Sequence, residues 1–248
     1  MTAPAAAAAL FNPDPRIERR ELPGGVSVFV VDDALREPRR LVDFAAEHWA
    51  LAREAAHNAF PGPELPMPDA FTARLEAWFN AHLRRLLGGR RTLRAHSRLA
   101  MATWPVGRLQ PRQWLCHRDR DAVHPGERVA ASVLYLFDDA ALGGTAFYAP
   151  RRDPASTAML VHDSCTLPEA AFRQRHPDVT AGYLVGDNAW FAQIGAIEPR
   201  FNRLIAYDGD VFHTSHVADA ARLSGDPRRG RLTINGFFTL RAALGRDA

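Results

Sequence analysis

The chain has 248 residues, of which 47% are hydrophobic and 24% are charged, as in an ordinary globular protein. Its 31 basic and 28 acidic residues give a net charge of +3, and the scattered basic residues lack the stripe that nucleic-acid binders show. Two cysteines, Cys116 and Cys165, exclude a disulfide framework and a thiolate metal site and fit a reducing cytoplasm. No apolar run approaches the ~18 residues of a membrane span, so a membrane partner is excluded too.

The first third of the chain predicts a strand and two helices. We expect residues 1–20, which begin with an alanine-rich segment, to be a flexible tail. The β-branched segment 26–31 predicts a strand. Apolar residues recur at helical spacing in 37–56 and in 70–87, with a proline-rich loop at 61–68 between them.

From residue 93 the pattern changes to short strands separated by Gly, Pro and Asp. The predicted strands are 93–104, 113–119, 129–137, 145–148, 203–207, 211–217 and 231–240. Strands at this density favour a sandwich or barrel. Segments 167–176 and 186–194 look helical or irregular, and we expect 151–200 to be an insertion that covers the barrel mouth as a lid.

The chain is therefore expected to be a single domain over residues 1–248. In this prediction the strand and the two supporting helices of 21–92 pack against an antiparallel β core formed by 93–248. The fold class would be α+β, and mainly β.

Two histidines and an aspartate carry the main functional signal. His117 and Asp119 lie two apart in a predicted strand, so their side chains share a face. His213 ends another apolar segment, and His216 three residues later is an alternative to it. Two imidazoles and one carboxylate form the facial triad that holds non-haem Fe(II). An ion pair on a solvated strand is the competing interpretation of His117 and Asp119.

Three stretches together resemble the double-stranded β-helix oxygenases that use Fe(II) and 2-oxoglutarate. They are 109–119 around the His-x-Asp motif, 132–145 with its YLF and GGT elements, and 203–213 followed by 230–238. The likeness is to the prolyl-hydroxylase-like enzymes, in an uncharacterised bacterial branch. It implies a double-stranded β-helix core, jelly-roll or cupin-like, with the N-terminal helices packed on it.

The resemblance also implies roles for individual residues. The iron ligands would be His117, Asp119 and His213. Arg231 would pair with the distal carboxylate of 2-oxoglutarate, because a guanidinium fork matches a planar carboxylate. Thr233, two residues along the same face, would add a hydrogen bond. Tyr135 either reaches the cosubstrate or is a core aromatic.

The activity implied by the resemblance is that of a dioxygenase, a hydroxylase-type oxidoreductase that consumes O2. Asp119 favours hydroxylation or desaturation, because a halogenating relative needs a small residue there. The expected substrate is a small molecule, such as an amino acid, a peptide or a carrier-bound metabolite; a homodimer is left open. Two alternatives are a β-barrel binding or regulatory module without turnover and a cupin-like metalloenzyme that does not use 2-oxoglutarate. The pair Arg231 and Thr233 favours the dioxygenase over both.

Overall fold

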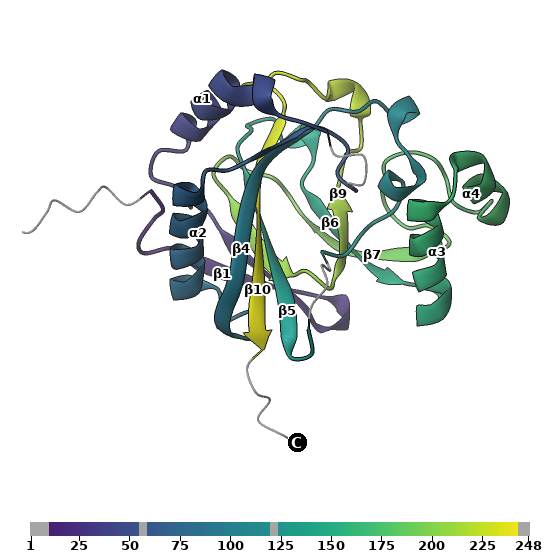
Figure 1. Ribbon diagram of the computed structural model, residues 1–248, viewed down its shortest axis with the longest axis horizontal. Helices are drawn as coiled ribbons and strands as arrows, with labels where there is room; N and C mark the ends of the chain where they lie inside the picture. Colours follow the sequence, from purple (N-terminus) through teal and green to yellow (C-terminus); the bar gives the residue numbers. More distant parts are fainter. Residues whose placement is uncertain (1–9, 55–58, 120–123, 243–248) are drawn as a thin grey trace, which may run out of the picture.

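The computed structural model describes residues 10–54, 59–119 and 124–242 (Figure 1). Its strands form two antiparallel sheets. The larger sheet contains, in spatial order, β1 (Ile17–Leu22), β2 (Val26–Val31), β8 (Leu204–Asp208), β5 (Glu127–Tyr135), β10 (Arg231–Ala242), β4 (Gly89–Ala102) and β3 (Glu64–Pro66). The smaller sheet contains β7 (Phe191–Ile197), β6 (Thr145–Pro150) and β9 (Phe212–Ser215).

The order of the strands identifies a double-stranded β-helix. His117 forms an isolated antiparallel bridge with His213 and so extends the smaller sheet beyond β9. From β4 onward the chain passes to His117, to β5, through β6 and β7, to β8, to β9 and back to β10. Of these, β4, β5, β8 and β10 lie in the larger sheet, whereas His117, β6, β7 and β9 lie in the smaller one. This is the jelly-roll core expected from the sequence.

The two N-terminal helices cover the outer face of the larger sheet. They are α1 (Arg39–His48) and α2 (Asp69–His82), and Figure 1 shows both on the side of β4 and β10. Their apolar residues pack with outward-facing residues of β4 and β10 in the largest core cluster. Within it, the rings of Phe79 and Phe238 stack nearly parallel with centroids 3.7 Å apart. Helices α3 (Pro154–Thr166) and α4 (Glu169–Arg175) lie beside the smaller sheet and pack there around Trp114 and Phe172 (Figure 1).

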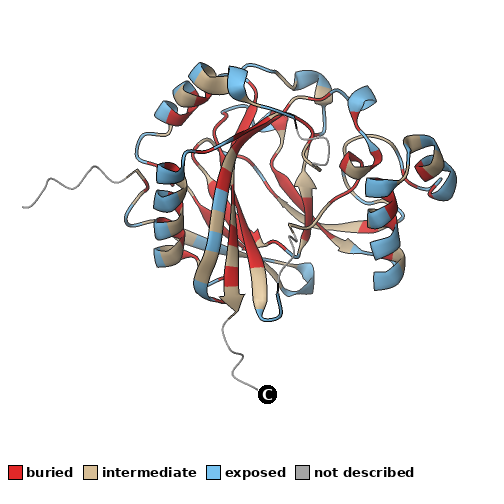
Figure 2. Cartoon of the chain, viewed as in Figure 1, coloured by how far each residue is buried: buried red, intermediate tan, exposed pale blue. Residues whose placement is uncertain are grey.

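Buried and exposed residues are distributed as expected for helices that cover packed sheets. Figure 2 shows that the helices are exposed on their outer surfaces, whereas buried positions follow the strands between the layers. None of the helices in the described ranges is both long and apolar enough to cross a membrane.

The structure corrects several predictions about segments. The predicted tail, 1–20, was wrong for residues 17–20, which begin strand β1 and pair with β2, while residues 1–9 lie outside the described part. The range 151–200 is not an insertion throughout, because Phe191–Ile197 is strand β7 of the smaller sheet. The segment 113–119 is extended only at the His117 bridge, and 111–113 form a 3₁₀ turn. Both predicted helices are shorter than expected, and α2 is followed by turns up to Gly88, whose φ of +71° stops the chain from continuing as a helix.

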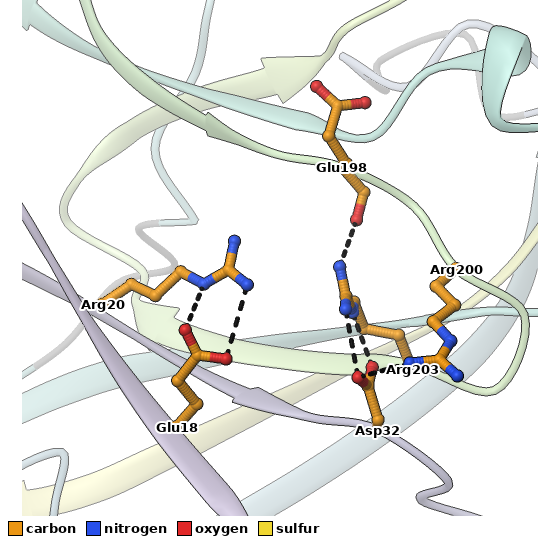
Figure 3. Close-up of polar contacts among 6 residues, drawn as sticks. All are labelled: Glu18, Arg20, Asp32, Glu198, Arg200 and Arg203. Carbon is orange, nitrogen blue, oxygen red and sulfur yellow. Dashed lines mark hydrogen bonds and ion pairs between the residues drawn. The ribbon is translucent and has the colours of Figure 1, made fainter.

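An ionic cluster joins the N-terminal hairpin to the barrel (Figure 3). Asp32 follows β2 and accepts hydrogen bonds from Nε and Nη2 of Arg203, at 2.7 and 3.1 Å, just before β8. Arg200 adds a third bond to the same carboxylate, at 3.0 Å, and Arg203 Nη1 donates to the carbonyl of Glu198. The hydrogen bond from Arg203 lowers the pKa of Asp32. The cluster fixes the two neighbouring strands at one end.

Candidate metal centre

The backbone brings the two histidines together. The N–H of each of His117 and His213 donates to the carbonyl of the other, and both distances are 2.9 Å. The N–H of Asp119 donates to the carbonyl of Gly209 at 2.8 Å, so the chain on both sides of Arg118 follows the 209–213 segment. Histidines 96 positions apart in the sequence thus share one rigid frame for their side chains.

The three side chains converge on one point. One ligand atom from each of His117, Asp119 and His213 lies within 4.8 Å of the other two. The Nε2 atom of His213 is 3.2 Å from Oδ2 of Asp119, and Nε2 of His117 is 3.6 Å from Oδ1. Two nitrogen donors and one carboxylate on one side of a pocket suit a divalent transition metal and leave its other coordination positions open.

Hydrogen bonding and charge prepare these side chains for a cation. Nδ1 of His213 lies 2.9 Å from the carbonyl of Val211, which requires the proton on Nδ1 and makes Nε2 the atom that would bind a metal. Burial, and then the neighbouring His213, lower the pKa of His117 to about 4, so its imidazole is neutral at pH 7. Burial opposes the charge on Asp119, but His213, His117 and Arg98 together outweigh it, and the carboxyl pKa lies below its ordinary value.

The structure distinguishes the two candidate distal histidines by position. His213 is paired with His117 and joins the cluster, whereas the backbone N–H of His216 donates to the carbonyl of Gly144 at 3.0 Å. Among the described residues, His216 is in no group of potential ligands. The geometry thus places His213 beside His117 and Asp119, while its role as a ligand stays a prediction.

Arg231 and Thr233 line the same pocket as the three side chains. The Arg231 side chain is 1% exposed; its Nε donates to the carbonyl of Gly143 at 3.0 Å and its Nη2 to that of Gly144 at 2.6 Å. The Thr233 hydroxyl donates to the carbonyl of Ala100 at 3.2 Å. The third guanidinium nitrogen, Nη1, has no hydrogen-bond partner in the described part of the chain.

Tyr135 does not line the pocket but lies behind Thr145, which does. The Tyr135 hydroxyl is 2.8 Å from Oγ1 of Thr145. The tyrosine is fully buried in a core cluster, and burial raises its pKa to about 12. Tyr135 is therefore a core aromatic in this structure, in contact with the pocket through the Thr145 hydroxyl.

Sequence reasoning missed the other end of the pocket wall. Alternate residues of β10 line the pocket, and they are Arg231, Thr233, Asn235 and Phe237. The period of two that placed Thr233 on the face of Arg231 also covers Asn235 and Phe237. That periodicity was the signal that could have identified both.

The fold and the pocket define the class of this protein. It is a double-stranded β-helix protein in which a His-Asp-His cluster shares a pocket with an arginine. The particular family follows from the sequence, because the model of the "Family of unknown function (DUF6445)" matches residues 13–238. The chain belongs to that family. A search of curated proteins returns no match.

Solved structures similar to the chain include two prolyl 4-hydroxylases. One is from Phytophthora capsici, with 12% identity, a TM-score of 0.42, and coverage of 87% of this chain and 59% of that one. The other, from Pseudomonas putida, has 16% identity, a TM-score of 0.42, and coverage of 83% and 86%. HygX from Streptomyces hygroscopicus, with nickel and 2-oxoglutarate bound, has 12% identity, a TM-score of 0.45, and coverage of 88% and 83%. The chain spans 59% of the length of the first of these proteins. Likenesses this distant carry no argument about activity, which rests on the site itself.

Proposed function

We propose that this protein is an Fe(II)- and 2-oxoglutarate-dependent oxygenase that oxidises a small molecule. The observation that supports it is the shared pocket, in which the His117, Asp119 and His213 cluster faces the inner side of β10 with Arg231 and Thr233. A cation site alone fits many metalloenzymes. A buried arginine in the same small pocket fits a cosubstrate with a carboxylate at the end remote from the metal.

In this proposal, His117, Asp119 and His213 hold Fe(II). When bound, the iron supplies, together with 2-oxoglutarate and O2, the oxidising chemistry, and the oxo acid leaves as succinate and CO2. Asp119 provides a negative charge that partly offsets the metal's. The Val211 carbonyl fixes the orientation of the His213 ring. Hydroxylation and desaturation both suit a site with a carboxylate ligand.

Arg231 orients the cosubstrate. Its two hydrogen bonds to the carbonyls of Gly143 and Gly144 hold the guanidinium in place, and Nη1 is left to donate to a carboxylate. A buried cation of this kind gains more from an anionic partner than an exposed one, since water screens it less. The Thr233 hydroxyl on the same wall adds a second polar contact.

The same hydrogen bonds favour a second candidate. Because Arg231 already uses two nitrogens to fasten the 143–144 turn, its role could be structural, and the pocket would then belong to a metalloenzyme that does not use 2-oxoglutarate. The two candidates differ in one property, which is whether the metal-loaded protein binds the oxo acid through Arg231.

An anaerobic titration separates them. Fe(II) is added to the protein, then 2-oxoglutarate, and the visible metal-to-ligand charge-transfer band of the chelate is recorded. We expect a band in the wild type, none in Asp119→Ala, and a much weaker affinity for 2-oxoglutarate in Arg231→Lys. His216→Ala is the matched control and should keep the band. Metal binding without the band supports the second candidate, and a wild type that binds no metal excludes both.

The substrate class proposed from the sequence is a small amino acid, a peptide or a carrier-bound metabolite. A cytoplasmic location, a homodimer and a single domain over residues 1–248 remain predictions.

A further inference from the structure

The inner wall of the pocket continues from β10 onto β4. These strands pair in antiparallel register, with Asn235 opposite Arg98 and Phe237 opposite His96. Directly opposed residues in an antiparallel pair lie on the same face. Since Asn235 and Phe237 line the pocket of the metal cluster, Arg98 and His96 lie on the inner side too. Ser97 and Leu99, between and beside them, are buried on the helix side instead.

Arg98 has unused hydrogen-bonding capacity. Its Nη1 donates to Oε2 of Glu64 at 2.9 Å, and the guanidinium lies 4.7 Å above the ring of Phe237. Its Nε is buried and has no hydrogen-bond partner among the described residues. The side chain as a whole is 32% exposed, so a solute can reach it. Because Nε itself is occluded, an anion would reach the exposed part of the guanidinium, beside the Nη1 bond to Glu64.

Arg98 lies at the opposite end of the wall from Arg231. The residue opposite Arg98 is Asn235, which lies four positions after Arg231 in β10. At ~3.3 Å per residue along a strand, this separation is about 13 Å. Two arginines therefore stand on one wall, one near each end of the pocket.

We propose that Arg98 binds a carboxylate of the substrate, with Phe237 and His96 as an aromatic surface beside it. This inference rests on the proposed function, because it assigns the Arg231 end to 2-oxoglutarate and leaves the Arg98 end to the molecule that is oxidised. The substrate is accordingly an anionic small molecule whose carboxylate lies toward β4. A guanidinium fork suits this role, since it can engage a planar carboxylate through two nitrogens.

The alternative is that Arg98 serves only to pair with Glu64, which is itself 8% exposed. In that case the guanidinium would contribute to stability and not to ligand binding. The two roles differ in whether removing the charge changes affinity for a carboxylate ligand without changing affinity for its neutral counterpart.

Benzoate and benzamide are suitable probes, because they share a ring and differ in the carboxylate. Saturation-transfer NMR on the metal-free protein, with 2-oxoglutarate present, gives their dissociation constants. We expect benzoate to bind at least about tenfold more tightly than benzamide. Arg98→Gln, whose amide can still bond Glu64, should weaken benzoate binding by about tenfold or more. Arg94→Gln, an exposed arginine on the same face of β4, is the matched control and should have no effect.

A second measurement tests the position of the probe. With Mn(II) in place of Fe(II), the unpaired electrons should speed the relaxation of the benzoate ring protons in the wild type and much less in Arg98→Gln. No benzoate binding in the wild type, equal binding in Arg98→Gln, or bound benzoate that is not relaxed by Mn(II) bound to the protein would each overturn the proposal. If the wild type binds benzoate through Arg98 but takes up no metal, the proposed oxygenase function fails and the carboxylate site stands.

Discussion

The two faces of β10 have different chemistry although they belong to one strand. On the outer face, Leu232, Ile234 and Phe238 pack against the helices in the largest core cluster. On the inner face, Arg231 and Thr233 are just as buried but are hydrogen bonded to backbone carbonyls. The difference predicts that the helix side supplies stability and that the inner side supplies the polar groups of the pocket. Because adjacent side chains of a strand point in opposite directions, substitutions should affect one property with little effect on the other.

The largest effect is expected on the helix side. Phe79→Ala removes one ring of the stack with Phe238 and should lower the free energy of unfolding by about 3–5 kcal/mol, as for other buried aromatic truncations. Denaturant unfolding measures it. Phe237→Ala, on the inner face and only partly buried, is the control with a smaller loss. If both variants lost the same stability, the two faces would not differ as described.

The second prediction concerns the metal. Asp119→Ala removes the only carboxylate of the cluster and should weaken Mn(II) binding by at least about 100-fold, more than the loss of an outer-shell contact usually costs. An EPR titration of free Mn(II) gives the affinity. His216→Ala should bind Mn(II) like the wild type. Equal losses in both variants would contradict the assignment of the cluster.

A smaller effect is expected at the far end of the pocket. Arg231→Lys keeps the charge but loses the planar fork, so 2-oxoglutarate affinity should fall by roughly 10- to 100-fold while Mn(II) affinity is unchanged. Calorimetry with the Mn(II)-loaded protein measures both. An unchanged affinity for 2-oxoglutarate would favour the structural role of Arg231.

The smallest effect is expected outside both faces, at the ionic cluster of Figure 3. Asp32→Asn removes a carboxylate that is 34% exposed, and solvent screening limits the loss to about 1 kcal/mol at pH 7. The folded-state pKa of Asp32 is depressed, so its contribution is present above the ordinary value of 3.8 and is lost as the pH falls below it. Unfolding curves at pH 7 and at acid pH should therefore converge for the two proteins. A difference that grew on acidification would contradict this sign.

Sequence patterns predicted the core strands that carry strong alternation or apolar runs, and they failed where the signal was in the connections. Strand β1 is polar and was assigned to a tail, although the Pro23-Gly24-Gly25 turn that follows it, with both glycines at positive φ, is a hairpin signal. Helix α3 lacks a clear apolar stripe, but Asp153 caps its first turn by accepting a hydrogen bond from the Ser156 N–H, and Pro154 follows the cap. Strand β7 has a central glycine and mostly half-buried residues. Its sequence therefore shows neither the alternation of a strand nor the spacing of an amphipathic helix.

The candidate site was predicted as a set of residues but not as an arrangement. Spacing alone left His213 and His216 as alternatives, because both follow the same apolar segment. Their difference is a long-range property, namely the backbone pairing of His213 with His117. Tyr135 could not be placed either, since a tyrosine with a buried partner such as Thr145 has the same local pattern as one facing a ligand.

The Gly143-Gly144 turn has a consequence for the dimensions of the pocket. A Cβ at Gly143 would lie 1.7 Å from the carbonyl oxygen of His216, and one at Gly144 would lie 1.9 Å from that of Ile197. Neither position can therefore accept a side chain, and the two carbonyls that accept hydrogen bonds from Arg231 are held by close main-chain packing. If Arg231 binds an oxo acid as proposed, this fixed turn sets where its guanidinium lies, and redesign for a longer cosubstrate would have to begin by shortening that side chain.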